Sequence, residues 1–208
     1  MSLEFWCPLR LEASAARRAV RAAGVARTGG GPRRAAAFSG RRAAADQAHT
    51  CAVVLGLGGA VSDALAPGDA VVADVVRGPV DDRPVGGPAA EAILSWLRAA
   101  GVEAVRGPVR SVARPVYGSR RHSLAAEGTL AVDMESWWLL AAEPRPLAVV
   151  RVVCDAPGAE LVSLSLPWRV RRSLAVLSRI AATLEDREAL LGQYSHIGPE
   201  YAAFGGTS

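Results

Sequence analysis

Two hydrophobic patterns alternate along the chain and predict strands and helices in turn. Short runs of apolar and β-branched residues, typical of buried strands, occupy residues 3–9, 25–28, 50–55, 70–76 and 147–154. Apolar residues spaced three and four apart predict helices over residues 12–23, 33–46, 88–100, 119–127, 135–143 and 168–184. This alternation predicts an α/β fold, a single three-layer α/β/α domain with a central mixed, twisted sheet.

The length of the chain, 208 residues, suits one domain with a sizeable core. We expect the core to span about residues 3–185 and residues 186–208 to form a C-terminal tail, frayed from residue 197 onward. No apolar run is long enough to span a membrane, and the first residues do not resemble a secretory signal. The three widely spaced cysteines are expected to be buried thiols in a reducing compartment, which predicts a cytoplasmic protein.

All basic residues are arginines, which excludes chemistry that needs a lysine, such as a Schiff base or a P-loop. The formal net charge is +4 at pH 7, and arginines cluster within residues 17–42 and 106–121. Such clusters can bind phosphate, nucleic acid or an anionic membrane surface, but only two aromatic residues, Phe38 and Tyr117, lie among them, which argues against a nucleic-acid platform. Arginine recurs along the whole chain, so we prefer compositional bias, with solvated arginines on helix 168–184, and keep peripheral membrane contact as the alternative.

Two carboxylates stand at the ends of apolar elements in the second half of the chain. Asp155 ends the buried strand just before an Ala-Pro-Gly turn, at the edge where α/β sheets bind ligands. Glu135 would begin the helix that precedes this strand. Singly, each has a structural explanation, a helix macrodipole for Glu135 and a turn cap for Asp155. Together they indicate a candidate site.

Two glycine-rich turns could bring backbone close to a ligand. Residues 56–60 follow a strand and invite a dinucleotide-binding interpretation, which we reject because a new strand begins near residue 70 and leaves no room for a crossover helix. We expect these glycines to let backbone approach a ligand at the strand's end. Residues 29–32 open a helix, where free N–H groups can form an anion or water pocket, although a simple turn explains them equally well.

No metal site is expected from the sequence. His49, His122 and His196 are isolated, and neither a CxxC nor an HExxH motif occurs.

Five features occur in an order that one enzyme superfamily shares. They are Glu12 after the first strand, Thr-Gly-x-Gly at 28–31, Gly-x-Gly-Gly followed by Pro-Gly-Asp within 56–76, Asp-Met-Glu-Ser at 133–136, and Arg-Val-Val-x-Asp at 151–155. Over roughly residues 3–185 the chain resembles the nucleoside phosphorylase and nucleosidase superfamily, which includes methylthioadenosine/S-adenosylhomocysteine nucleosidase. Its length and motifs look most like the hopanoid-associated phosphorylases, with futalosine hydrolase second.

The resemblance implies cleavage of a purine N-glycosidic bond, with Asp155 as the acid beside purine N7 and Glu12 orienting or deprotonating water. It places Glu135 on the ribose hydroxyls and Met134 against the ribose. The other implied site residues line the ligand: Gly58 and Gly59 along the nucleoside, Val116 at the base, and Thr28, Gly29, Gly31 and Arg33 around a phosphate or water pocket. No cofactor is implied, and phosphate would be the co-substrate of a phosphorylase.

Several alternatives remain open at this stage. The first hypothesis is release of adenine from adenosylhopane in hopanoid biosynthesis, and the second is hydrolysis of futalosine or methylthioadenosine. A third, of another class, is a non-catalytic nucleoside-binding or membrane-surface protein. Gly30 and Leu57 depart from the residues usual in the superfamily, and Trp137 with Trp138 either shapes an apolar mouth or, as we prefer, belongs to the core. Relatives imply a homodimer or larger homo-oligomer.

Overall fold

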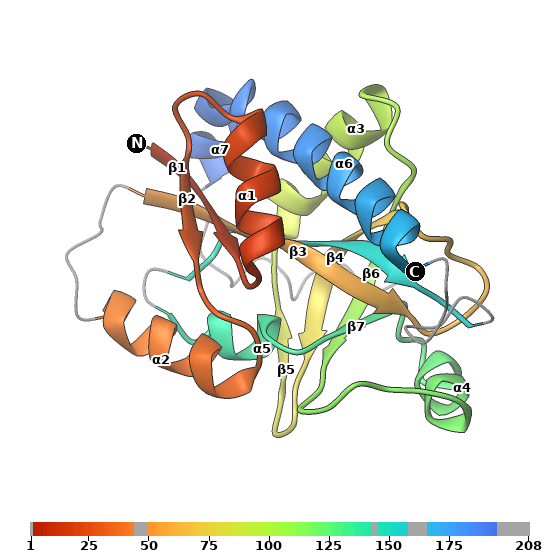
Figure 1. Ribbon diagram of the computed structural model, residues 1–208. Coiled ribbons are helices and arrows are strands. Elements are labelled where there is room, and N and C mark those ends of the chain that lie inside the picture. The colour runs from red at the N-terminus through yellow and green to blue at the C-terminus, as the bar shows by residue number, and fades with distance from the viewer. Residues whose placement is uncertain (1, 44–49, 143–144, 158–165, 195–208) are drawn as a thin grey trace, which may run out of the picture.

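A computed structural model describes residues 2–43, 50–142, 145–157 and 166–194 (Figure 1). All its strands belong to one mixed sheet, in which β8 pairs with β3 in parallel and with β4 antiparallel. Strands β3, β7, β6, β4 and β8 close a ring, and β1 and β2 extend the sheet from β3. The strands are β1 (Ser2–Cys7), β2 (Gly24–Arg27), β3 (Thr50–Ala60), β4 (Ala70–Arg77), β5 (Asp82–Pro84), β6 (Ala104–Ser111), β7 (Ala131–Asp133) and β8 (Ala148–Asp155).

Helices cover both faces of this sheet (Figure 1). One apolar core lies beneath α1 (Arg10–Ala19), α3 (Gly87–Ala99), α6 (Leu166–Glu185) and α7 (Glu188–Tyr194). A second core lies beneath α2 (Pro32–Ala43) and α5 (Ser136–Leu139), and a small third cluster packs against α4 (Ser119–Ala126). The three-layer α/β prediction is therefore confirmed. None of the described helices is long and apolar enough to cross a membrane.

Strand β8 is buried along its whole length, as its run of β-branched residues predicts. Because successive side chains alternate between faces, Val150 and Val152 join the core under α1 and α6, whereas Val149 and Val153 join the core under α2. Arg151 lies on the same face as Val149 and Val153 and is fully buried. A guanidinium at this depth requires charged partners, and it fixes the position of the candidate site.

Some element boundaries differ from those the sequence predicts. Helix α1 ends at Ala19 rather than residue 23, because Val20 is extended. Strand β3 continues through the glycines to Ala60, so these residues pair with β8 rather than forming a turn. Helix α5 has only one turn, and helix α7 lies within the segment expected to be a tail, where Leu191 joins the core. The predictions for residues 44–46, 143 and 197–208 fall outside the described residues.

Candidate active site

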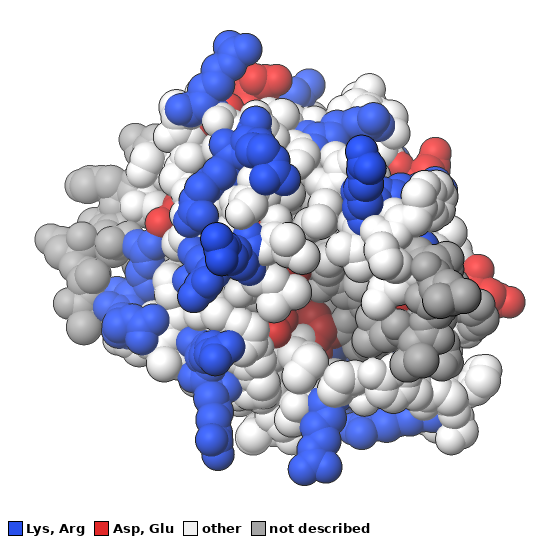
Figure 2. Space-filling model, in the orientation of Figure 1, with Lys and Arg blue, Asp and Glu red and all other residues white. Residues whose placement is uncertain are grey.

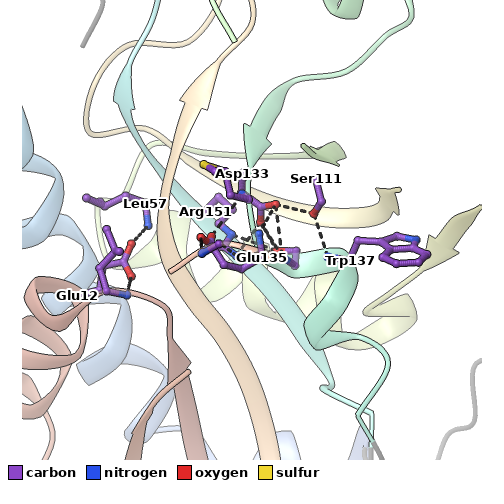
Figure 3. A network of polar contacts seen from close by, with 11 residues as sticks. Glu12, Leu57, Ser111, Asp133, Glu135, Trp137 and Arg151 are labelled. Atoms are coloured by element: carbon purple, nitrogen blue, oxygen red, sulfur yellow. Dashed lines mark hydrogen bonds and ion pairs between the residues drawn. The ribbon is translucent and has the colours of Figure 1, made fainter. Parts of the chain in front are cut away.

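Arg151 stands at the centre of a buried polar network (Figure 3). Its Nη2 lies 2.6 Å from Asp133 Oδ2 and 4.0 Å from Glu135 Oε2, and both Nε and Nη2 donate to Ser136 Oγ. Burial alone would lower the pKa of Arg151, but Asp133, Glu135 and Glu12 together raise it. The remaining nitrogen, Nη1, is buried and has no hydrogen-bond partner among the described residues. A donor left open in a buried site is where a ligand or a water can bind.

Glu12 lies beside Arg151 on the first turns of α1, and its side chain is almost fully buried. Its Oε1 accepts from Leu57 N at 2.7 Å and its Oε2 from Leu9 N at 2.5 Å (Figure 3). Burial raises its pKa to about 7, although Arg151 and the two N–H groups oppose the shift. A carboxylate with a pKa near neutrality, held in one orientation, can accept a proton from water at physiological pH.

Glu135 links the network to the glycine turn before α2. Its Oε1 accepts from Gly31 N at 2.7 Å, and the side chain is nearly buried. Burial and the charge of Asp133 raise the pKa of Glu135, whereas Arg151 opposes the shift. The N–H that we expected to bind phosphate or water is therefore taken by a carboxylate of the protein itself. The nearby Thr28 hydroxyl is buried and has no partner in the described part of the chain.

Asp133 and two serines hold this arrangement in place. Asp133 Oδ1 accepts from Ser111 Oγ at 2.5 Å, and Asp133 Oδ2 accepts from the hydroxyl and backbone N–H of Ser136. Ser111 Oγ in turn accepts from Trp137 N at 2.9 Å. Asp133 thus satisfies the first N–H of α5, and Glu135 precedes that helix directly, at the helix start where the sequence placed it. These contacts leave Glu135 free to face Gly31 and Arg151 (Figure 3).

Asp155 forms a second buried cluster at the end of β8. Its Oδ2 pairs with Arg121 Nη2, and its Oδ1 lies 3.6 Å from Cys154 Sγ. Arg121 comes from α4, is buried, and also donates to Val116 O at 3.0 Å and Ala60 O at 2.7 Å. Asp155 and Arg151 lie four residues apart on β8, roughly 13 Å along the strand, and the register with β3 shifts between them at Gly58 and Gly59.

The glycines of β3 make room for these side chains. A methyl group on Gly56 would run into Arg151 Nη1 and lie 3.1 Å from Glu12 Oε1. One on Gly58 would lie 3.3 Å from Arg151 Cβ, and one on Gly59 would lie 2.8 Å from Asp155 Oδ1. In the structure these glycines therefore let β8 side chains approach β3. Their contact with a nucleoside stays a prediction.

The structure brings Glu12, Glu135 and the turn containing Thr28, Gly29 and Gly31 together around Arg151. It places Asp155 with Val116 at the other end of the site. Met134 is half-buried beside Glu135 and packs against the cluster that includes Val116 and Val132. Arg33, in contrast, is exposed on α2 and has no ion pair among the described residues. The roles assigned to these residues remain predictions.

Sequence reasoning missed the two arginines of the site. Arg151 interrupts a run of β-branched residues in a strand buried on both faces, and that interruption could have identified it, because a charge there must be paired. Arg121 belongs to a stretch rich in exposed arginines, and no local pattern separates it from them.

Trp137 and Trp138 pack against the core beneath α2 and α5, as preferred from the sequence. Both are partly buried. Trp137 Nε1 donates to Asp81 Oδ1 at 2.7 Å, and Arg83 stacks 3.8 Å from the indole centroid. Trp138 O accepts from Ser39 Oγ at 2.8 Å. Trp137 and Trp138 therefore connect α5 to the β4–β5 hairpin and to α2.

Comparison with known proteins identifies the fold. No family model and no curated protein matches the chain. Methylthioadenosine/S-adenosylhomocysteine nucleosidase from Neisseria meningitidis, in complex with methylthio-immucillin-A, superposes with a TM-score of 0.72 at 18% identity, covering 89% of this chain and 99% of that one. The nucleosidase from S. pneumoniae, with the transition-state inhibitor MT-ImmA, gives 0.68 at 16% identity, covering 88% and 100%.

Futalosine hydrolase of Helicobacter pylori strain 26695 gives a TM-score of 0.72 at 14% identity, covering 90% of this chain and 98% of that one. At these identities the likeness establishes the fold alone. The chain has the nucleoside phosphorylase and nucleosidase fold, as its motifs led us to expect.

Proposed function

We propose that this protein is an enzyme that hydrolyses the N-glycosidic bond of a purine nucleoside. The observation that carries the proposal is the pairing of Glu12, whose pKa is about 7, with the open Nη1 of Arg151 in one buried site. A pure binding protein has no need of a carboxylate held at a neutral pKa. The fold is shared with nucleosidases whose structures hold nucleoside analogues, which supports the same class of substrate.

In the proposed reaction Glu12 takes a proton from water as the water oxygen bonds to C1′ of the ribose. The bond from C1′ to N9 breaks, and its electron pair stays with the purine. Asp155 gives N7 a proton that it takes up from solvent once the purine has displaced Arg121 from its Oδ2, and the proton on Glu12 returns to solvent. Glu135 accepts hydrogen bonds from the ribose hydroxyls and offsets positive charge on the ribosyl group. Arg121 now occupies Asp155 Oδ2, so the purine must compete with it for that oxygen.

Hydrolysis is favoured over phosphorolysis by the charges around Arg151. One guanidinium faces Glu12, Asp133 and Glu135, and Glu135 already holds the Gly31 N–H. A phosphate dianion would meet three carboxylates and a single cation, whereas a neutral water is not repelled. Phosphate as co-substrate, and Arg33 as its ligand, are therefore the less favoured alternative.

The 5′ substituent is a finer part of the proposal. The sequence motifs favour adenosylhopane as the substrate. Futalosine and methylthioadenosine are equally compatible with the fold of the solved neighbours. The base, in all these cases, would lie between Asp155 and Val116.

The test is release of free base from these three nucleosides, with and without phosphate, by wild type, Glu12→Gln and Asp155→Asn. We expect release that does not need phosphate, a free sugar as the other product, and a loss of roughly 10²–10⁴-fold in each variant. Nucleoside binding, measured by calorimetry, should persist in Asp155→Asn. A sugar 1-phosphate would make the protein a phosphorylase, and binding without release by wild type would make it a nucleoside-binding protein.

A further inference from the structure

Arginines at the surface face carboxylates on one part of the molecule and face none on another. Around β4, β5 and β6 they face carboxylates: Arg77–Asp82, Arg83–Asp81, Arg106–Asp74 and Arg110–Glu127 lie within 3.9 Å. On α1 and α6 the exposed arginines have no carboxylate partner among the described residues; they are Arg10, Arg17, Arg18, Arg171, Arg172 and Arg179.

The two acidic residues of α1 and α6 are engaged elsewhere. Glu12 is buried in the candidate site. Glu185 accepts from the backbone N–H groups of Arg21, Ala22 and Ala23, with distances of 2.7 to 2.9 Å. Figure 2 shows the result: arginine side chains gather over α1, α2 and α6, with few carboxylates between them. Bias in composition explains how many arginines there are, but not why those on this face have no carboxylate partner among the described residues.

Large apolar side chains are exposed on the same face. Leu9 and Leu11, at the start of α1, are 45% and 59% exposed, and Trp168, in the first turn of α6, is 62% exposed. Arg172 lies 5.8 Å from the Trp168 ring centroid. Tryptophan and arginine side by side are typical of surfaces that sit at the level of lipid headgroups.

A groove of about 340 Å³ runs between the two helices. Val170 and Leu174 of α6 form part of its apolar lining, and Arg18 and Arg171 line it from the two helices. A cationic lining beside an apolar one matches a phospholipid, whose phosphate would meet the arginines while its first methylenes meet the valine and leucine.

From these observations we propose that the α1–α6 face, defined by Arg10, Arg17, Arg18, Arg171, Arg172, Leu9, Leu11 and Trp168, docks on an anionic phospholipid bilayer. A second copy of the chain would bring arginines against arginines, which is unfavourable. Leu9 also donates its N–H to Glu12, so docking would hold the bilayer next to the candidate active site. The proposal does not depend on the reaction that the site catalyses.

The experiment is sedimentation with vesicles of phosphatidylcholine mixed with phosphatidylglycerol, and of phosphatidylcholine alone. We expect binding to the mixed vesicles only, weakened by added salt. Arg18→Gln with Arg171→Gln should lower the affinity about 25-fold, roughly fivefold for each arginine. Trp168→Ser should lower it severalfold even at high salt, because its contribution is apolar.

The matched control is Arg106→Gln with Arg110→Gln, which removes the same charge from paired arginines outside the face and should change the affinity less than about twofold. Thermal unfolding shows whether the variants are folded. Failure to bind the mixed vesicles, or an equal loss in the control, would overturn the proposal. So would tighter binding to a DNA duplex than to vesicles, or a dimer that only the Arg18 and Arg171 variant disrupts.

Discussion

Two buried arginines organise the two ends of the candidate site, and they differ in how completely they are satisfied. Arg121 faces one carboxylate, and each of its three nitrogens has a partner: Val116 O, Ala60 O and Asp155. Arg151 faces three carboxylates and has one nitrogen without a partner among the described residues.

The difference shows where a ligand is needed. The Arg121–Asp155 ion pair is complete without a ligand, because every nitrogen of Arg121 already has a partner. A nucleoside must therefore displace Arg121 to reach Asp155. The Arg151 network is incomplete in itself, because its carboxylates outnumber its cation and a donor is unused. We therefore place the attacking water and the ribose at Arg151 and the departing base at Arg121.

The largest effect that tests this comparison comes from removing each cation. Arg151→Met leaves Glu12, Asp133 and Glu135 buried without it, and we expect the free energy of unfolding to fall by about 5 kcal/mol, whereas Arg121→Met should cost about 3 kcal/mol. Urea unfolding at neutral pH measures both. At lower pH the loss of stability caused by Arg151→Met should be smaller, because protonation neutralises the buried carboxylates. Equal losses with no pH dependence would contradict the distinction.

A smaller effect concerns the pH dependence of stability. The folded pKa of Glu12 is about 7, above its ordinary value, so the folded state holds its proton more tightly than the unfolded state. The free energy of unfolding should therefore fall as the pH rises toward 7, by about 3 kcal/mol from this residue. Above that pH Glu12 is ionised in both states, and the free energy of unfolding stays lower by this full amount. Glu12→Gln should flatten this part of the curve, and an unchanged slope would show that Glu12 is not the group responsible.

The smallest effect uses two glycines as a matched pair. Gly56→Ala places a methyl group against Arg151 Nη1 and should lower base release about tenfold, because the site must shift to admit it. Gly40→Ala, on α2, meets nothing within 4 Å and should raise stability by about 0.5–1 kcal/mol without changing activity. If both variants release base at the wild-type rate, the close packing at Gly56 is unimportant for the reaction.

Sequence patterns predicted the fold because the hydrophobic periods are clear. Strand β8 is recognisable from its apolar run, and α6 from its spacing of Leu177, Ala181 and Leu184. Boundaries were wrong at the ends of two helices: Val20 ends α1 early, and α5 stops after one turn at Leu139. Glycines that looked like a turn are part of β3, because pairing with β8 holds them extended.

The site was predictable only in part. Glu12, Glu135 and Asp155 could be proposed from motifs, but the sequence does not show which cation each one faces. That depends on the pairing of β3 with β8 and on the place of α4, both of them long-range. The contact between Gly31 and Glu135, which disfavours phosphate, joins residues 104 positions apart in sequence.

The most direct test is the pH dependence of base release by wild type and Glu12→Gln in phosphate-free buffer. If Glu12 activates water, kcat/KM of the wild type should rise with pH and reach half its plateau near pH 7, because only the ionised carboxylate accepts the proton. Glu12→Gln should lose both the rise and most of the rate. A wild-type rate that does not change across this range, or a Glu12→Gln variant with the same rise, would contradict the account.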